Sequence, residues 1–423
     1  MQLSIFMRIF LLVFTTLHAL GQSRPERVSA IAESLRARVL ADRRDFHAHP
    51  ELSNREQRTA AVIAERLKSL GLEVRTGIAR HGVIGILKGG KPGPVVAWRA
   101  DIDALPIEES GDKPYKSLNK GVKHACGHDA HIAIALGTVE TLVKMRDQIP
   151  GTVKFIFQPA EEGAPIGEEG GATLMIKEGA LENPKPQAIF GLHVTTWNEA
   201  GKISYSSGPA MASADILEIK LKGKKTHAAF PHQGIDTVVV AAECIMALQT
   251  IRSRRIDPSE PMVLTIGSMH GGNRFNIVAE EVVLQGTVRT LSENVRESVR
   301  SMVRKTLEGC TAMNDATFEV QWHEPSYPVT FNDPKLTSEN LTGLRQSVGA
   351  ENVVESKATM GSEDFSYYQK VIPGFFWFLG ASNAKKGITA AHHTADFEID
   401  EDILVPGVKA AANQLLDYLE RTK

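Results

Sequence analysis

The chain has 423 residues, a formal net charge of −2, and 42% hydrophobic and 23% charged residues. This length exceeds what one ordinary hydrophobic core fills, so the composition predicts a globular protein of two domains. The balanced charge contains no long basic or acidic run, which argues against a nucleic-acid partner.

The N-terminus is typical of an export signal. Arg8 precedes an apolar stretch that continues to Leu20, and Ala19 and Gly21 provide small residues at a cleavage site. Residues 1–21 are therefore predicted to be a signal peptide, which makes the mature protein secreted or periplasmic and free of the membrane. An uncleaved helix at the membrane surface is the alternative. Three cysteines, an odd and sparse count, argue against a disulfide framework.

The first half of the chain alternates helical and strand patterns. Helices are expected at residues 24–46, 56–70 and 132–143, and short apolar strands at 72–76, 83–87, 94–98, 152–157 and 188–194. This alternation predicts an α/β domain built on a mixed, mostly parallel sheet.

The pattern then changes. Strands are expected at residues 215–222, 262–268, 282–291 and 317–322, with helices at 236–251 and 293–310. The order strand–helix–strand–strand–helix–strand predicts a ferredoxin-like α+β unit. The α/β pattern resumes with a strand at 374–379 and a helix at 403–419. We therefore expect a catalytic domain of residues 24–204 and 325–423, with residues 205–324 inserted as a dimerisation or lid domain.

Metal-binding side chains crowd just before the helix at 132–143. They are His124, Cys126, His128, Asp129 and His131. Cys thiolate and neutral imidazole are ligands of zinc, manganese and cobalt, so a transition metal is the expected occupant. A His-rich helix start with one buried Cys is the alternative.

Further polar clusters follow the predicted strands. They are Asp101 and Asp103, Glu161 and Glu162, His193, and His392 and His393. Carboxyl ends of parallel strands meet at one sheet edge, so these groups are expected to share a site. Of two adjacent glutamates, one can bind a metal while the other takes a proton from water activated there. A closed structural zinc site would need only four ligands.

Five ordered motifs resemble one known family. They lie at residues 46–53, 99–106, 126–128, 157–162 and 361–365. Together they resemble the dinuclear-metal amidohydrolases, a group of metallopeptidases that includes hippurate hydrolases, N-acyl-amino-acid hydrolases and plant auxin-conjugate hydrolases. The resemblance runs from about Arg24 to the C-terminus.

The resemblance implies a site. Its metal ligands would be Cys126, His128, Glu162, His193 and His393, with Glu161 as general base and proton shuttle. His393 is favoured over His392 because Phe397 stands at the family's aromatic position, although Ala395 replaces its usual Pro. Asp101 and Asp103 would orient ligands, and His124 and His131 would be structural. His47 and His49 would either line the cleft floor or serve in packing.

The inserted domain carries further residues that the resemblance implicates. His227 would enter the partner subunit's site and stabilise the tetrahedral oxyanion, which implies a homodimer. Asn276 and Arg289 would surround the substrate carboxylate, since a guanidinium matches a carboxylate in shape. Asn276 is less secure, because Ala279 stands where the family usually has Pro.

The sequence thus predicts a metal-dependent amidohydrolase. It would cleave small N-acyl or N-aroyl amino acids to a carboxylic acid and a free amino acid. Two divalent ions are expected, Mn or Zn, with Co or Ni also compatible. A carboxypeptidase or dipeptidase on the same scaffold is the alternative, and a metal-binding protein without turnover is a third reading.

Overall fold

The computed structural model describes residues 22–422. The predicted signal peptide, residues 1–21, lies outside the described residues. None of the helices described over residues 22–422 combines the length and hydropathy that a membrane span requires.

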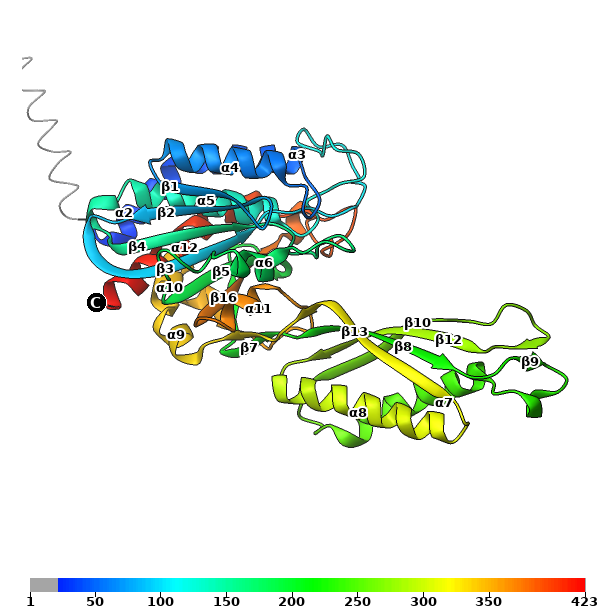
Figure 1. The fold of residues 1–423 in the computed structure, drawn as a ribbon. Coiled ribbons are helices and arrows are strands. Elements are labelled where there is room, and N and C mark those ends of the chain that lie inside the picture. The colour runs from blue at the N-terminus through cyan, green and yellow to red at the C-terminus, as the bar shows by residue number, and fades with distance from the viewer. Residues whose placement is uncertain (1–21, 423) are drawn as a thin grey trace, which may run out of the picture.

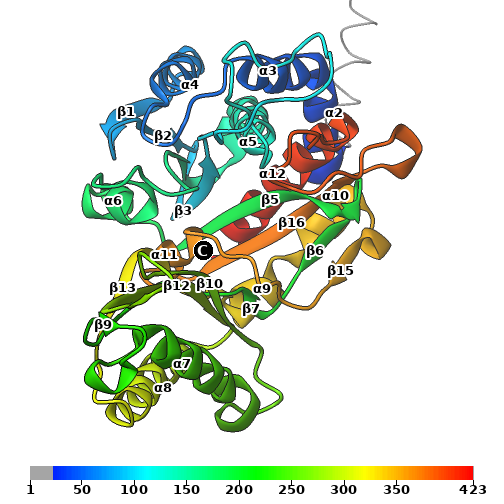
Figure 2. The same ribbon diagram turned by 90° about the vertical axis from the view of Figure 1, so that its right-hand side faces the viewer.

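The larger part of the molecule is built on an eight-stranded sheet (Figures 1 and 2). In spatial order its strands are β1 (Glu73–Ile78), β2 (Gly82–Lys88), β4 (Pro150–Gln158), β3 (Lys91–Asp101), β5 (Ala188–Glu199), β16 (Gly374–Ser382), β6 (Ile203–Tyr205) and β15 (Val353–Glu355). The four central strands β4, β3, β5 and β16 run parallel to one another, and β1 and β2 are antiparallel. The mixed sheet with a parallel centre confirms the predicted fold class.

Helices cover both faces of this sheet. The first face carries α2 (Arg24–Ser34), α3 (Arg36–Ala48), α4 (Gln57–Ser69), α5 (His128–Val143), α10 (Leu341–Val348) and α12 (Leu404–Arg421). The second face carries α6 (Gly171–Lys177) and α11 (Phe365–Gln369). Strand β2 shows the alternation that separates the two cores: Val83 and Leu87 face the first, while Ile84 and Ile86 face the second.

The helix predicted over residues 24–46 is in fact two helices that meet at Leu35. The Ser34 hydroxyl donates to Ile31 O at 2.6 Å, and the Leu35 amide donates to Ala32 O, three residues back. Local bonds of this kind tighten the last turn and compete with the α-helical pattern. The single-helix prediction was therefore wrong at this position.

A second sheet forms its own layer with two helices on one face (Figure 1). Its antiparallel strands, in spatial order, are β10 (Met262–Gly271), β12 (Glu281–Thr290), β8 (Ala214–Lys222) and β13 (Thr317–Tyr327). Helices α7 (Thr237–Thr250) and α8 (Glu293–Ala312) pack on this sheet around a separate hydrophobic core. The chain order β8–α7–β10–β12–α8–β13 is the ferredoxin-like order that the sequence predicted.

Two adjacent crossings connect the sheets. β7 (Gly208–Met211) leads out of the larger part and pairs with β14 (Thr330–Asn332), which leads back. α9 (Pro334–Glu339) follows β14. The division of the chain at residues 205 and 325 remains a prediction.

Candidate active site

The candidate site lies where the central strands of the larger sheet end. Gly127 stands between Cys126 and His128 at the start of α5, with φ +96, and a Cβ at this position would lie 2.2 Å from Val194 Cγ2. Only glycine tolerates both this φ and this close approach. The backbone therefore passes tightly over the end of β5, which brings Cys126 and His128 to the same edge as His193.

The five predicted metal ligands come together there. The Cys126 Sγ lies 3.3 Å from His193 Nε2 and 3.3 Å from His393 Nε2, and the latter lies 3.1 Å from Glu162 Oε1. The ligand atoms fall into two groups, each within 4.8 Å: Cys126 with His128 and His193, and Cys126 with Glu162 and His393. Cys126 is common to both groups.

Two histidines have one ring nitrogen fixed and the other directed at the cluster. His128 Nδ1 donates to Asp103 O at 2.8 Å, and His193 Nδ1 donates to Val194 O at 2.5 Å. The buried His128 Nε2 meets no hydrogen-bond partner within residues 22–422. A hydrogen bond donated by Nδ1 leaves Nε2 unprotonated in the neutral ring, which is the tautomer that binds a metal through Nε2. The donor set therefore fits a bound cation.

Electrostatics support the same fit. Burial, together with the neighbouring Glu162 and Glu161, raises the pKa of the Cys126 thiol well above its ordinary value. Burial and the nearby carboxylates thus disfavour the thiolate form of Cys126. A divalent cation would reverse this balance, because it stabilises both thiolate and carboxylate.

Between the two adjacent histidines, His393 has the shorter contacts. The Nδ1 of His392 is 3.8 Å from Cys126 Sγ, and its Nε2 accepts from the Thr196 amide at 3.4 Å. The His392 ring also lies against Phe397, with centroids 4.7 Å apart. The geometry therefore assigns His392 to the wall of the site and His393 to the ligand cluster.

Glu161 lies beside the ligands. One of its carboxylate oxygens is 3.9 Å from His128 Nε2, and its backbone carbonyl accepts from the Tyr327 hydroxyl at 2.7 Å. Burial raises the pKa of Glu161 well above its ordinary value, and Glu363 and Glu162 add to this rise. A carboxylate with a raised proton affinity suits proton shuttling.

Asp101 ends β3 and Asp103 follows it, and the two carboxylates have different partners. Asp103 accepts from the Ser53 hydroxyl at 2.7 Å and from the Glu162 amide at 3.1 Å, so it holds the glutamate segment. Asp101 accepts a hydrogen bond from His131 Nδ1 at 2.5 Å, whereas its other carboxylate oxygen lies 3.8 Å from His128 Nε2. Asp101 therefore orients a structural histidine rather than a ligand.

The remaining histidines of the sequence motifs lie away from the cleft. His47 is fully buried between Asp129, at 2.7 Å, and Glu109, at 2.9 Å. His49 contacts the Asp45 carbonyl. His124 is buried, and burial lowers its pKa to about 4. Of the two roles open for His47, the structure shows packing.

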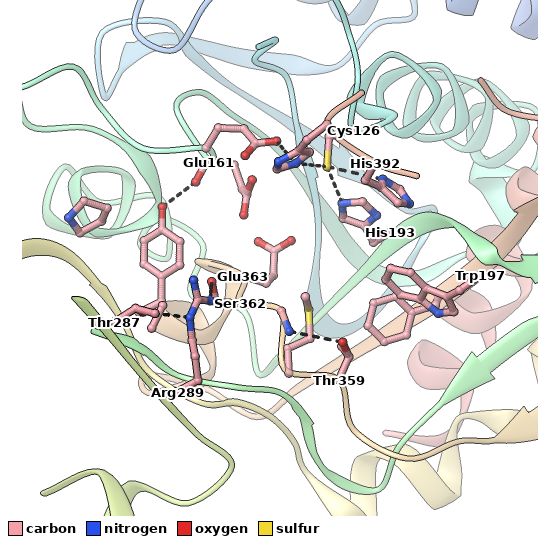
Figure 3. A pocket seen from close by; sticks show the side chains of 18 of the residues that line it. Cys126, Glu161, His193, Trp197, Thr287, Arg289, Thr359, Ser362, Glu363 and His392 are labelled. Carbon is pink, nitrogen blue, oxygen red and sulfur yellow. Dashed lines mark hydrogen bonds and ion pairs between the residues drawn. The ribbon is translucent and has the colours of Figure 1, made fainter. Parts of the chain in front are cut away.

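A cleft of about 450 Å³ opens from the ligand cluster towards the inserted domain. Arg289 lines it and donates to the Ser362 hydroxyl at 2.8 Å. Apolar side chains contribute much of the lining, among them Trp197, Met211, Ile216, Pro325 and Phe378. Figure 3 shows the cation of Arg289 on the opposite side of the cleft from Cys126. The cleft can thus receive a small molecule with an anionic end and an apolar end.

His227 and Asn276 lie elsewhere. His227 is exposed on β9 (Thr226–His227), which pairs with β11 (Ile277–Val278), and Asn276 O accepts from the Ala228 amide at 3.1 Å. Neither residue lines the cleft. Figure 1 shows β9 at the end of the inserted domain farthest from the larger sheet. Within one chain, these two residues do not join the other predicted site residues.

Comparison with known proteins identifies the family of the chain. Residues 97–417 match the model of peptidase family M20/M25/M40. The chain belongs to this family. A thermostable carboxypeptidase of Saccharolobus solfataricus is 40% identical over 375 residues, which cover 88% of this chain and 93% of that protein. The N-acetyl-L-cysteine deacetylase of Bacillus subtilis is 36% identical over 408 residues, 95% of this chain and 93% of that protein.

Solved structures agree. A Bacillus subtilis protein described as a dinuclear metal-binding peptidase of the M20 family matches with a TM-score of 0.79 and 34% identity, over 92% of this chain and 99% of that one. The predicted family resemblance is confirmed, and this M20-family chain is a metal-dependent hydrolase of amide bonds.

Some residues that line the cleft were not predicted from the sequence. Glu363 lines the cleft, and Arg99 holds its carboxylate at 2.9 Å while also contacting Asp364 at 2.8 Å. The motif at residues 361–365 was noticed, but nothing in it indicated which carboxylate faces the cleft. Tyr327 and Trp197 gave no signal, because single aromatic residues on strands usually serve in packing.

Proposed function

We propose that this protein hydrolyses N-acyl or N-aroyl amino acids with the help of two divalent ions, Mn or Zn, with Co or Ni as alternatives. The observation that carries the proposal is the pair of ligand groups that share Cys126, with Glu161 beside them. The similarity to a deacetylase of an N-acetyl amino acid and to a dinuclear metal-binding peptidase supports it.

The proposed reaction combines Lewis acidity from the bound ions with proton transfer and substrate binding by residues of the chain. Bound divalent ions would contribute Lewis acidity, which polarises the scissile carbonyl and acidifies water. Glu161 takes the proton of the attacking water and passes it to the departing amine. Arg289 binds the carboxylate of the amino-acid part. The wall around Trp197 and Phe378 receives the acyl group, which places the amide over the ligand cluster.

A homodimer completes the proposal. His227 is exposed and lies outside its own cleft, so it is free to enter the cleft of a second copy and stabilise the oxyanion there. Asn276, next to it, would accompany it to the substrate. The outer strand β10 exposes Val263 and Met269, and an apolar sheet edge of this kind favours pairing with a second copy. Sedimentation of the purified protein tests this state, and a fully active monomer would contradict it.

Export remains part of the proposal. A signal peptide at residues 1–21 would deliver the mature enzyme to the periplasm or the exterior. N-terminal sequencing of protein recovered from those compartments is expected to start near Gln22. A mature protein that still begins at Met1 would contradict export with cleavage.

A substrate panel tests the activity. Purified protein with MnCl2, and separately with ZnCl2, is assayed on hippurate, on N-acetyl amino acids and on unblocked dipeptides. We expect the acylated substrates to give a kcat/KM at least about tenfold higher, since an apolar wall disfavours an α-ammonium group. Preference for dipeptides would establish the carboxypeptidase or dipeptidase alternative, which the carboxypeptidase relative favours. Metal binding without any hydrolysis would leave a binding protein.

A further inference from the structure

The segment that carries His393 has no regular structure of its own. Between the short helical turns at Ala384–Lys386 and Glu401–Ile403, the described chain forms neither a helix nor a strand. His393 itself has φ +61, in the left-handed region that residues other than glycine rarely adopt. Its amide donates to Ala125 O at 2.9 Å. The position of the His393 ring therefore depends on contacts from other parts of the chain.

Lys123 provides such contacts from inside the molecule. Its Nζ donates to Ala395 O at 2.8 Å and to Phe397 O at 2.7 Å, and it lies 3.7 Å from the Glu109 carboxylate. The side chain is only 1% exposed. An ammonium group buried this deeply is costly unless its donors are satisfied. These partners satisfy it, so the lysine holds the segment that follows His393.

The backbone of Lys123 is anchored as well. Its amide and carbonyl exchange hydrogen bonds of 3.0 Å with Leu105, and its carbonyl also accepts from the Ala125 amide at 2.9 Å. Cys126 follows three residues later. Lys123 therefore adds a side-chain connection between the segment that presents Cys126 and the segment that presents His393, beside the backbone bond from the His393 amide to Ala125 O.

The other ligand group does not depend on this connection. His128 begins α5 and donates to Asp103 O, while His193 lies on β5 and donates to Val194 O. Neither imidazole contacts the segment at residues 394–397 through a hydrogen bond in the described structure. Loosening that segment would displace His393 and leave His128 and His193 in place.

We propose that Lys123 is a positioning residue that holds His393 against Cys126 and so sets the affinity of one of the two cation sites. The site affected is the group of Cys126, Glu162 and His393, and the group of Cys126, His128 and His193 is spared. This inference rests on the proposed dinuclear function.

Titration of the chelator-dialysed, folded protein with MnCl2 tests the inference. The Lys123→Met variant keeps the length of the side chain and removes its donors. We expect it to bind one ion as the wild type does and the second ion roughly 10–100-fold more weakly. Losses of this size are usual when a residue that holds a metal ligand in place is removed. Lys123→Arg, which retains donors, should fall between the two. Lys120→Met, at an exposed lysine nearby, is the matched control and should bind as the wild type does.

The identity of the weakened site is checked by comparison with His393→Ala. The inference requires that Lys123→Met and His393→Ala weaken the same ion, so a combined variant should show little additional loss. Binding of both ions by Lys123→Met with wild-type affinities, or equal weakening of both, would overturn the inference. A wild type that binds only one ion would overturn the proposed dinuclear function together with it.

A second variant covers the case in which Lys123→Met does not fold. The Ser110 hydroxyl lies nearer the surface, 3.0 Å from the same Ala395 carbonyl oxygen and next to the Asp396 carboxylate, and can donate its one proton to either. Ser110→Ala should weaken the same ion by about tenfold, at the lower end of such effects. Unchanged binding of both ions in a folded Ser110→Ala variant would also overturn the inference.

Discussion

The edge of the central sheet and the tip of the inserted domain hold their polar residues in opposite ways. At the edge, Cys126, His128 and His193 are buried, and the rings of the two histidines are oriented by further hydrogen bonds. At the tip, His227 is exposed on a two-residue strand, and its Nδ1 accepts a hydrogen bond from the Ala229 amide at 3.0 Å. One chain brings the first constellation together by itself, whereas a role for the second depends on the proposed homodimer.

The largest effect is expected at the edge. Glu161→Gln removes the proton acceptor and keeps the shape, so kcat should fall by roughly 10²–10⁴, the usual contribution of a general base. Metal content, measured by elemental analysis, should stay as in the wild type. Glu65→Gln, at an exposed glutamate on α4, is the control. A Glu161→Gln variant with wild-type turnover would refute the proposed mechanism.

The tip is tested by His227→Ala. We expect kcat to fall by roughly 10²–10³, as when an oxyanion donor is lost, with metal content unchanged. His232→Ala, at an exposed histidine of the same loop, should keep its activity.

Co-refolding sharpens the test of the tip. His227→Ala and Glu161→Gln chains, each nearly inactive alone, should together regain about a quarter of wild-type activity, because half of the dimers are mixed and each mixed dimer has one intact site. Absence of any recovery in confirmed mixed dimers would mean that His227 does not act in the partner's cleft.

The two neighbouring histidines give an intermediate effect. His393→Ala should weaken binding of one ion by about 100-fold or more, beyond what is lost when only a supporting partner is removed. His392→Ala should weaken it by about tenfold at most, because its ring packs on Phe397 and lies farther from Cys126. Chelator competition measures both. Equal losses of affinity would mean that the shorter contacts of His393 do not distinguish it from His392 as a ligand.

The smallest effect on activity is expected at the base of the inserted domain. Burial works against ionisation of Asp215, but hydrogen bonds from Arg296, Ser326 and Arg300 hold its pKa below the ordinary value. Asp215→Ala leaves those cations without their partner and should lower the free energy of unfolding by about 3 kcal/mol. Urea denaturation measures this, with exposed Glu308→Ala on α8 as control. Metal content should not change. A changed metal content would mean that the base of the inserted domain and the ligand cluster at the sheet edge are coupled.

The sequence predicted the fold, and it indicated which side chains would converge, because both leave local patterns. Buried apolar runs alternated with helices, and thiol, imidazole and carboxylate groups followed the strands in positions where they are otherwise uncommon. The break at Leu35 was missed because it depends on one serine hydroxyl bond. The contact of Lys123 with Ala395 spans 272 positions of the chain, and no local pattern indicates it.

Strands β5 and β16 lie side by side in the central sheet, yet the whole ferredoxin-like unit is made between them. During synthesis, the nascent chain therefore exposes Cys126, His128 and His193 long before His393 leaves the ribosome, and domains generally fold in the order in which they emerge. A polypeptide released before His393 would lack one member of the ligand cluster, so we expect it to be inactive.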